Sequence, residues 1–204
     1  MKTLTDQIIT RKLPNRILLT DSVRLADPRE SIRALPAGSG VILRHYDVPN
    51  RADLAREILS ICRPKKIPLL IAGDAYLAKA IGANGLHLPE EMLAKENGHW
   101  RKYISPKTFL CVAAHSPKAL CKAAEASATF ALLSPIFPTK SHPNSKAIGI
   151  NRFASWVTKS QIPVYALGGV NHQNENRVLA TRAVGWAAVG AFSKKTRLTI
   201  NNKL

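Results

Sequence analysis

Two glycine-containing turns near the end of the chain are the segments best suited to bind an anion. The apolar run 161–167 ends at Gly168 and Gly169, and the run that begins at Gly185 reaches a further glycine, Gly190. Glycine leaves the backbone N–H groups accessible to a phosphate oxygen that has to approach closely. Two consecutive glycine turns near the C-terminus are typical of the phosphate site of a (β/α)8 barrel. Tight turns without a ligand are the alternative explanation.

Polar side chains that follow the other predicted strands complete the candidate site, because parallel strands of a barrel end at one mouth. The side chains expected at this mouth are Asp21, Arg44, Asp74, His87, Glu90, Glu91, His115, Thr139, Ser141 and His142. They supply cations, carboxylates, hydroxyls and imidazoles. The sequence has no nucleophile elbow, Walker loop or HExxH motif, so hydrolase and nucleotide-triphosphatase functions have no support.

His115 is the candidate acid–base residue. It follows the predicted strand 108–114 and precedes Ser116, a suitable helix N-cap. An imidazole at this place could transfer a proton near neutral pH, or it could hydrogen-bond a loop. His87 lies inside an apolar run, so we expect a buried core imidazole. Asp74 begins a predicted helix and is either a metal ligand or an N-cap.

Short apolar runs alternate with helical patterns along the chain. We expect strands over 16–21, 40–44, 67–72, 85–88, 108–114, 129–133, 161–167 and 185–192, and helices over 29–35, 49–62, 74–82, 116–126 and 150–159, with a further helix opening at 89. This alternation implies parallel pairing with right-handed crossovers. Eight strands favour a closed barrel over a flavodoxin-like sheet, which needs about five. The predicted fold class is α/β, a single small (β/α)8 TIM barrel domain over 1–204 with an N-terminal extension over 1–15.

The chain is strongly basic. Its 204 residues include 30 Lys and Arg against 13 Asp and Glu, a formal net charge of +17. Such an excess attracts polyanions in general. The positive charges are scattered in short groups, however, and no run has the length of a nucleic-acid-binding tail. We therefore predict a basic, solvated surface and do not expect nucleic acid as a partner.

The cysteine pattern and the absence of long apolar runs indicate a cytoplasmic protein. Cys62, Cys111 and Cys121 are an odd number without CxxC spacing, which argues against a disulfide framework and against a zinc site. Cys62 and Cys121 fall in predicted helices, so we expect buried thiols. The segment 1–15 lacks the apolar region of a signal peptide, and no run reaches the roughly 18 apolar residues of a membrane span. No membrane partner is expected.

The motifs at the predicted strand ends, taken in order, resemble those of the thiamine phosphate synthase and TenI superfamily. They are LR at 43–44, AGD at 72–74, GLHL at 85–88, AHS at 114–116, SPIFPT at 134–139 and ALGGV at 166–170. The resemblance covers about 16–192 and implies a small (β/α)8 barrel. Its synthase members join hydroxymethylpyrimidine pyrophosphate to a thiazole phosphate with Mg²⁺. Its TenI members aromatise a thiazole phosphate carboxylate by proton transfer.

The chain departs from the synthase pattern where pyrophosphate and its metal would bind. Ile42 and Tyr46 stand where synthases have a glutamine and a lysine around Arg44, Gly73 replaces an asparagine, and Met92 replaces a metal-binding aspartate. Elsewhere Ala113 replaces a serine, and His142 a phosphate-loop lysine. Each lost charge-assisted contact costs about 1.5–3 kcal/mol, so these changes together disfavour metal-assisted displacement.

These departures make a TenI-like protein our first hypothesis. By the resemblance, it would bind a small phosphorylated thiazole ligand and tautomerise it, with His115 as the proton carrier and without a cofactor. Arg44 would contact the carboxylate, and the phosphate would be held by Thr139, Ser141, Gly168, Gly169 and Gly190. A homodimer is one assembly to be tested.

Two other hypotheses stay open. The first is a thiamine phosphate synthase (thiamine-phosphate diphosphorylase) with Mg²⁺ held by Asp74 and by Glu90 or Glu91. The second is a non-catalytic protein, either a degenerate barrel that keeps its ligand affinity or a basic nucleic-acid-binding protein. Metal-dependent coupling would indicate the synthase, and retention on single-stranded RNA with a steep salt dependence would indicate the nucleic-acid-binding protein.

Overall fold

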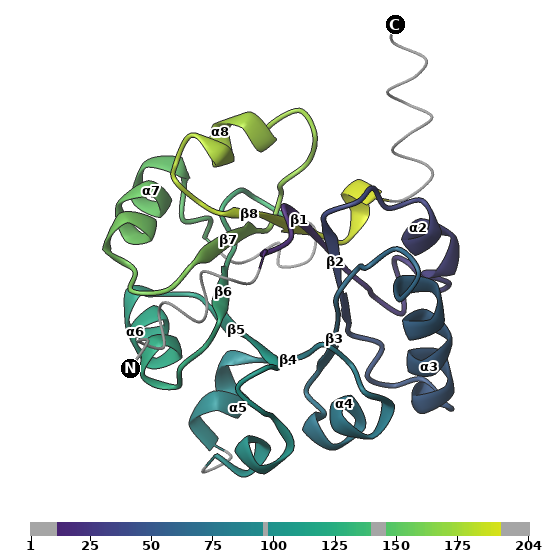
Figure 1. The fold of residues 1–204 in the computed structure, drawn as a ribbon. Coiled ribbons are helices and arrows are strands. Elements are labelled where there is room, and N and C mark those ends of the chain that lie inside the picture. Colours follow the sequence, from purple (N-terminus) through teal and green to yellow (C-terminus); the bar gives the residue numbers. More distant parts are fainter. Residues whose placement is uncertain (1–11, 96–97, 140–145, 193–204) are drawn as a thin grey trace, which may run out of the picture.

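Eight parallel strands pair in sequence order, and the last returns to the first to close a barrel (Figure 1). The structure is a computed structural model that describes residues 12–95, 98–139 and 146–192. The strands are β1 (Arg16–Leu19), β2 (Ser39–Leu43), β3 (Leu69–Ala72), β4 (Gly85–Leu88), β5 (Phe109–Ala114), β6 (Phe130–Leu133), β7 (Val164–Leu167) and β8 (Gly185–Ala188). The predicted α/β class and (β/α)8 barrel are therefore confirmed.

Helices connect successive strands and surround the barrel (Figure 1). They are α2 (Arg29–Arg33), α3 (Arg51–Cys62), α4 (Ala75–Ile81), α5 (Glu90–Lys95), α6 (Pro117–Glu125), α7 (Ile150–Lys159) and α8 (Glu175–Leu179), with short 3₁₀ helices η1 (His99–Tyr103) and η2 (Gly190–Phe192). Two of the predicted caps are present: Asp74 accepts a hydrogen bond from the Leu77 N–H and Ser116 one from the Ala119 N–H. Among the described residues, no helix is long and apolar enough to cross a bilayer.

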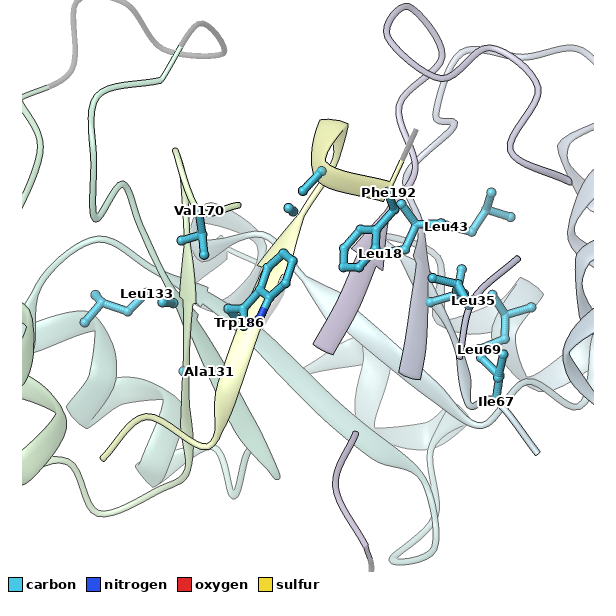
Figure 2. Packing of buried hydrophobic residues seen from close by; sticks show 14 of the residues in the cluster. Leu18, Leu35, Leu43, Ile67, Leu69, Ala131, Leu133, Val170, Trp186 and Phe192 are labelled. Atoms are coloured by element: carbon cyan, nitrogen blue, oxygen red, sulfur yellow. The ribbon is translucent and has the colours of Figure 1, made fainter. Parts of the chain in front are cut away.

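Side chains of each strand alternate between two buried layers. One face of the strands fills the barrel interior with Ile17, Leu19, Ile42, Leu70, Ala72, Cys111, Phe130, Leu132, Tyr165, Ala187 and Val189. The other face packs against the helices in a larger layer, part of which Figure 2 shows around Leu18, Leu43 and Trp186. Burial on both faces explains why the strands are continuous apolar runs in the sequence.

The end of the predicted N-terminal extension closes the base of the barrel. The Asn15 N–H donates to the carbonyl of Gly38, and the buried Tyr165 hydroxyl donates to the carbonyl of Pro14 over 2.6 Å. Leu13 packs against the interior layer. Because this end is filled, a ligand can approach the interior from the carboxyl ends of the strands.

Several predicted details differ from the structure. β3 begins at Leu69 rather than Ile67, since Pro68 has no N–H to give to the sheet. β8 ends at Ala188, and the apolar residues that follow form η2, where the Phe192 ring stacks on Trp186 at 5.0 Å between centroids (Figure 2). Cys121 is exposed, not buried as predicted, because α6 turns a different stripe of residues toward the barrel.

Candidate active site at the carboxyl ends of the strands

The Gly168–Gly169 turn follows β7 and packs tightly against the segment after β6. The two glycines have φ values of +92° and +68°. The Ile136 N–H donates to the carbonyl of Leu167, and the Phe137 N–H donates to that of Gly168. A Cβ atom at Gly168 would lie 2.8 Å from the backbone of Pro135. The glycines are therefore required for packing. This requirement alone would explain their presence in a tight turn that binds no ligand.

The same turn also has backbone N–H groups without an acceptor in the part of the chain that the structure describes. Within the described residues, the N–H groups of Gly168 and Gly169 have no hydrogen-bond acceptor. On the neighbouring strand, Gly190 begins η2, is exposed, and has open space where a Cβ would stand. Thr139 lies half-buried at the end of the segment that packs on this turn. The predicted residue Ser141 falls outside the described residues.

Arg44 lies at the end of β2 in a fixed backbone position. Its N–H donates to Oγ1 of the buried Thr20, which also lies 2.8 Å from Nδ1 of His45. Its Nη2 atom is 3.5 Å from Oδ2 of Asp21. Arg24, whose guanidinium hydrogen-bonds the same carboxylate, holds the pKa of Asp21 well below its usual range. Arg44 thus shares its counterion with a second arginine and keeps positive charge for a ligand.

His87 is the buried core imidazole that the sequence predicts. It lies on the interior face of β4, with Nδ1 3.1 Å from Sγ of Cys111 on β5. Desolvation, and to a lesser extent the charge of Arg44, lowers its pKa to about 3. Burial also raises the pKa of the Cys111 thiol. Both groups are therefore uncharged at neutral pH, and the interior below Arg44 is electrically neutral.

Arg51, which sequence reasoning missed, brings a second cation to this side of the mouth. It is the first residue of α3, and its Nη2 donates to the carbonyl of Ala72 at the end of β3 over 2.6 Å. Its Nη1 lies 3.7 Å from Oδ2 of Asp74, and its guanidinium lies over the ring of Tyr46 at 5.3 Å. A cation in the first turn opposes the helix dipole. That mismatch was the one signal in the sequence that could have singled it out.

Asp74 stands at the predicted metal position but does not form a metal site with its neighbours. Its Oδ1 caps α4 and its Oδ2 faces Arg51. Met92 places its sulfur near Gly73 rather than a second carboxylate. Across the described residues, no group of three His, Cys, Asp or Glu side chains is arranged to hold a metal ion. Asp74 and Met92 together supply one carboxylate, where the synthase motifs supply two for Mg²⁺.

His115 follows β5 and is held by Glu90 of α5. Oε2 of Glu90 lies 2.7 Å from Nδ1 of His115 and also accepts its backbone N–H at 3.0 Å. The imidazole is about half exposed and lines a groove between α5 and α6, with Ala119 and Lys122. Glu90 is therefore engaged by His115, not directed at Asp74. Glu90 contacts Nδ1, so Nε2 is the ring nitrogen of His115 that is available for proton exchange.

Fold and site together define a class. A closed (β/α)8 barrel with glycine turns after β7 and β8 and with arginines after β2 has features found in barrel proteins that bind small phosphorylated molecules at the carboxyl ends of their strands. Residues 20–192 match the family described as thiamine monophosphate synthase (TMP-TENI). The chain belongs to this family, and its relatives are enzymes.

Individual relatives agree with this assignment. The chain is 34% identical over 154 residues to a putative thiamine-phosphate synthase 2 of Aquifex aeolicus, covering 74% of this chain and 81% of that protein. It is 30% identical over 191 residues to a thiamine-phosphate synthase of Koribacter versatilis, covering 87% and 88%. A solved structure, thiamine phosphate pyrophosphorylase from Pyrococcus furiosus, superposes with a TM-score of 0.75 at 23% identity, covering 92% and 91%. That last likeness supports the fold.

Proposed function

We propose that this protein is a thiamine-phosphate synthase, which joins hydroxymethylpyrimidine pyrophosphate to a thiazole phosphate and releases diphosphate. The names of its relatives favour this function over the tautomerase that the motif departures favour. Departures from the synthase motifs concern how the pyrophosphate is held, and the structure supplies a cation, Arg51, that those motifs do not contain.

The arrangement that best supports the proposal is that the candidate anion-binding groups at the barrel mouth form two separate sets. Gly168, Gly169 and Gly190 follow β7 and β8. Arg44 and Arg51 lie beside the ends of β2 and β3, two to four strands away around the closed ring (Figure 1). A reaction between two phosphorylated substrates needs two such sets, with the reacting rings held between them.

In this arrangement the residues of the chain position the two substrates and neutralise the charge of their phosphate groups. The glycine N–H groups would bind the thiazole phosphate, and the two arginines would bind the pyrophosphate that leaves. Negative charge grows on the leaving group in the transition state, so fixed positive groups at that place favour bond cleavage. The buried, neutral His87 and the apolar layer below keep water out of the interior.

The test is direct coupling of the two substrates by the purified full-length chain, with thiamine phosphate measured by mass spectrometry. We expect product from the wild type and a loss of at least about tenfold in kcat/KM for Arg44→Gln, because a charge-assisted contact is removed. Arg56→Gln is the matched control, since Arg56 is exposed on α3 and pairs with Asp53. No product under any metal condition would refute the synthase proposal.

A second candidate, a thiazole phosphate tautomerase, is supported by the contact between His115 and Glu90. A carboxylate on Nδ1 orients an imidazole so that Nε2 can move a proton, as general acid–base catalysis requires. Tautomerase turnover that falls about 100-fold or more in His115→Ala would support this candidate. Turnover that is unchanged in that variant would remove His115 as the proton carrier.

A further inference from the structure

We propose that Arg51 is the cation that binds the pyrophosphate end of the substrate, and that it does so without a bound metal ion. The inference rests on the proposed synthase function for the identity of the anion. It goes beyond that function in assigning a new binding residue and a metal-independent mode of binding.

The first support is the place of the guanidinium in the fold. Arg51 belongs to α3, yet its hydrogen bond to the carbonyl of Ala72 brings the guanidinium to the carboxyl end of β3. Arg44 follows the neighbouring strand β2, and burial raises the pKa of the Tyr46 hydroxyl while the charges of Arg44 and Arg51 nearby lower it. The two cations therefore lie on the same side of the mouth.

The second support is that the guanidinium has more donors than partners. Its side chain is 15% exposed, and its Nε is buried without a hydrogen-bond partner. Among the described residues, the carbonyl of Ala72 accepts its single hydrogen bond, because Nη1 lies 3.7 Å from Asp74, too far for one. The guanidinium is paired with the Asp74 carboxylate but keeps donors that no described protein group accepts, and such donors favour the oxygens of a phosphorylated ligand.

The third support is that the guanidinium is held in place. The ring of Tyr46 lies under it at 5.3 Å, and the bond to Ala72 fixes Nη2. The Nη1 atom of this guanidinium lies 3.7 Å from the carboxylate of Asp74, the N-cap residue of α4, and has no hydrogen bond to it. Such a preorganised fork binds phosphate oxygens with less loss of side-chain entropy than a free arginine.

The nearby carboxylate does not offer an alternative through a metal. Asp74 uses one oxygen in the cap of α4 and turns the other to Arg51, and Met92 contributes no oxygen ligand. A divalent cation beside Asp74 would also lie within a few ångströms of a guanidinium, and like charges at that distance repel. Arg51 thus stands where the positive charge of a metal would otherwise be needed.

The experiment is calorimetric binding of inorganic pyrophosphate to the full-length chain in EDTA at physiological salt. We expect one site per chain in the wild type. Arg51→Met should weaken binding about 10- to 100-fold, the loss expected for a charge-assisted contact, and Arg51→Lys should lie between the two. Arg56→Gln, an exposed arginine of the same helix, should bind like the wild type and so report the contribution of the basic surface.

Two results would overturn the proposal. One is wild-type binding that is absent in EDTA and appears with Mg²⁺. The other is Arg51→Met binding pyrophosphate as tightly as the wild type. The first measurement needs no variant and tests metal independence even if Arg51→Met fails to fold. In that case Arg51→Lys tests the residue, and binding as tight as that of the wild type would count against Arg51.

Failure of this inference and failure of the synthase proposal are distinguishable. If pyrophosphate binding depends on Arg51 but the two substrates are not coupled, the Arg51 site is supported and the synthase proposal is refuted. If the two substrates are coupled but pyrophosphate binding does not depend on Arg51, the synthase proposal stands and the proposed Arg51 site is refuted.

Discussion

Oε2 of Glu90 lies 2.7 Å from Nδ1 of His115 and accepts the backbone N–H of the same residue at 3.0 Å. One carboxylate oxygen of α5 therefore fixes both the side chain and the main chain at the end of β5. The contact joins two consecutive β/α units at the rim of the barrel. It has a structural role whether or not His115 transfers a proton.

Glu90→Ala should lower the free energy of unfolding by about 1–2 kcal/mol, because two hydrogen bonds are lost, one of them charge-assisted, at a partly exposed site. Glu91→Ala, at the exposed neighbouring position, is the control and should change it by less than about 0.5 kcal/mol. Urea denaturation measures both. Equal stabilities of the two variants would show that the contact with His115 contributes nothing.

The glycines of the two anion-binding turns should respond differently to alanine. Gly168→Ala places a Cβ atom 2.8 Å from Pro135 at a φ of +92°, so strain and overpacking together should cost about 2–5 kcal/mol. Gly190→Ala meets no atom within 4 Å and should change stability by less than about 0.5 kcal/mol. Chemical denaturation of each variant tests the difference.

The Gly149→Ala variant separates the stability lost to backbone strain from that lost to steric overlap of the added Cβ atom. Gly149 has a φ of +78° and a ψ of 152° but open space around its Cβ position, so its variant should lose only the strain, about 1–3 kcal/mol. If Gly168→Ala is no worse than Gly149→Ala, the packing of the segment after β6 on this turn is not a source of stability. If the affinity for thiazole phosphate falls in the Gly190→Ala variant, whose stability should be unchanged, the loss comes from altered ligand binding and not from destabilisation of the fold.

Stability should fall in mild acid because of His87. Its pKa is about 3 in the folded protein and 6.5 in a free histidine, so the unfolded chain binds the additional proton between these values. The free energy of unfolding therefore rises with pH in this window, by up to about 1.4 kcal/mol per pH unit. The stabilising contribution is complete above 6.5 and is lost as the pH falls toward 3.

Unfolding free energies measured between about pH 4.5 and 6.5 test this, since the lowered pKa values of Asp21 and Asp27 affect stability mainly at and below their ordinary value of 3.8. In His87→Leu, an apolar replacement of similar size, the slope in this window should flatten. A slope equal to that of the wild type would contradict the assignment.

The order and number of the strands could be read from the sequence because each strand is buried on both faces and forms an apolar run. Strand ends were less predictable. The apolar character of Phe192 reflects its stacking on Trp186, not membership of β8. The exposed Cys121 was assigned to the core because the phase of a nine-residue helix is poorly defined by its sequence.

The positions of candidate site residues could be predicted where they directly follow a strand, as Arg44 follows β2 and Gly168 follows β7. They could not where a side chain reaches across from another element. Arg51 is separated by 21 residues from Ala72, whose carbonyl it binds. The pairing of Glu90 with His115 likewise spans 25 residues. Neither contact corresponds to a motif or a regular residue spacing that could be recognised in the sequence.

Asp74 allows the two roles considered for it, helix cap and metal ligand, to be separated by one pair of variants. Its Oδ1 accepts the Leu77 N–H at 2.8 Å. Asp74→Ala should destabilise the protein by about 1 kcal/mol, whereas Asp74→Asn keeps a good N-cap and should be close to the wild type. Thermal or urea unfolding measures this difference without any ligand.

The same pair then decides what the charge of Asp74 does at the mouth. If Arg51 supplies the positive charge, Asp74→Asn removes an anion that lies 3.7 Å from it, so pyrophosphate in EDTA should bind at least as tightly as to the wild type. Coupling by this variant should then persist without added Mg²⁺. If the carboxylate holds a metal, Asp74→Asn should instead lose coupling as fully as Asp74→Ala while remaining folded, because an amide is a weak ligand for Mg²⁺.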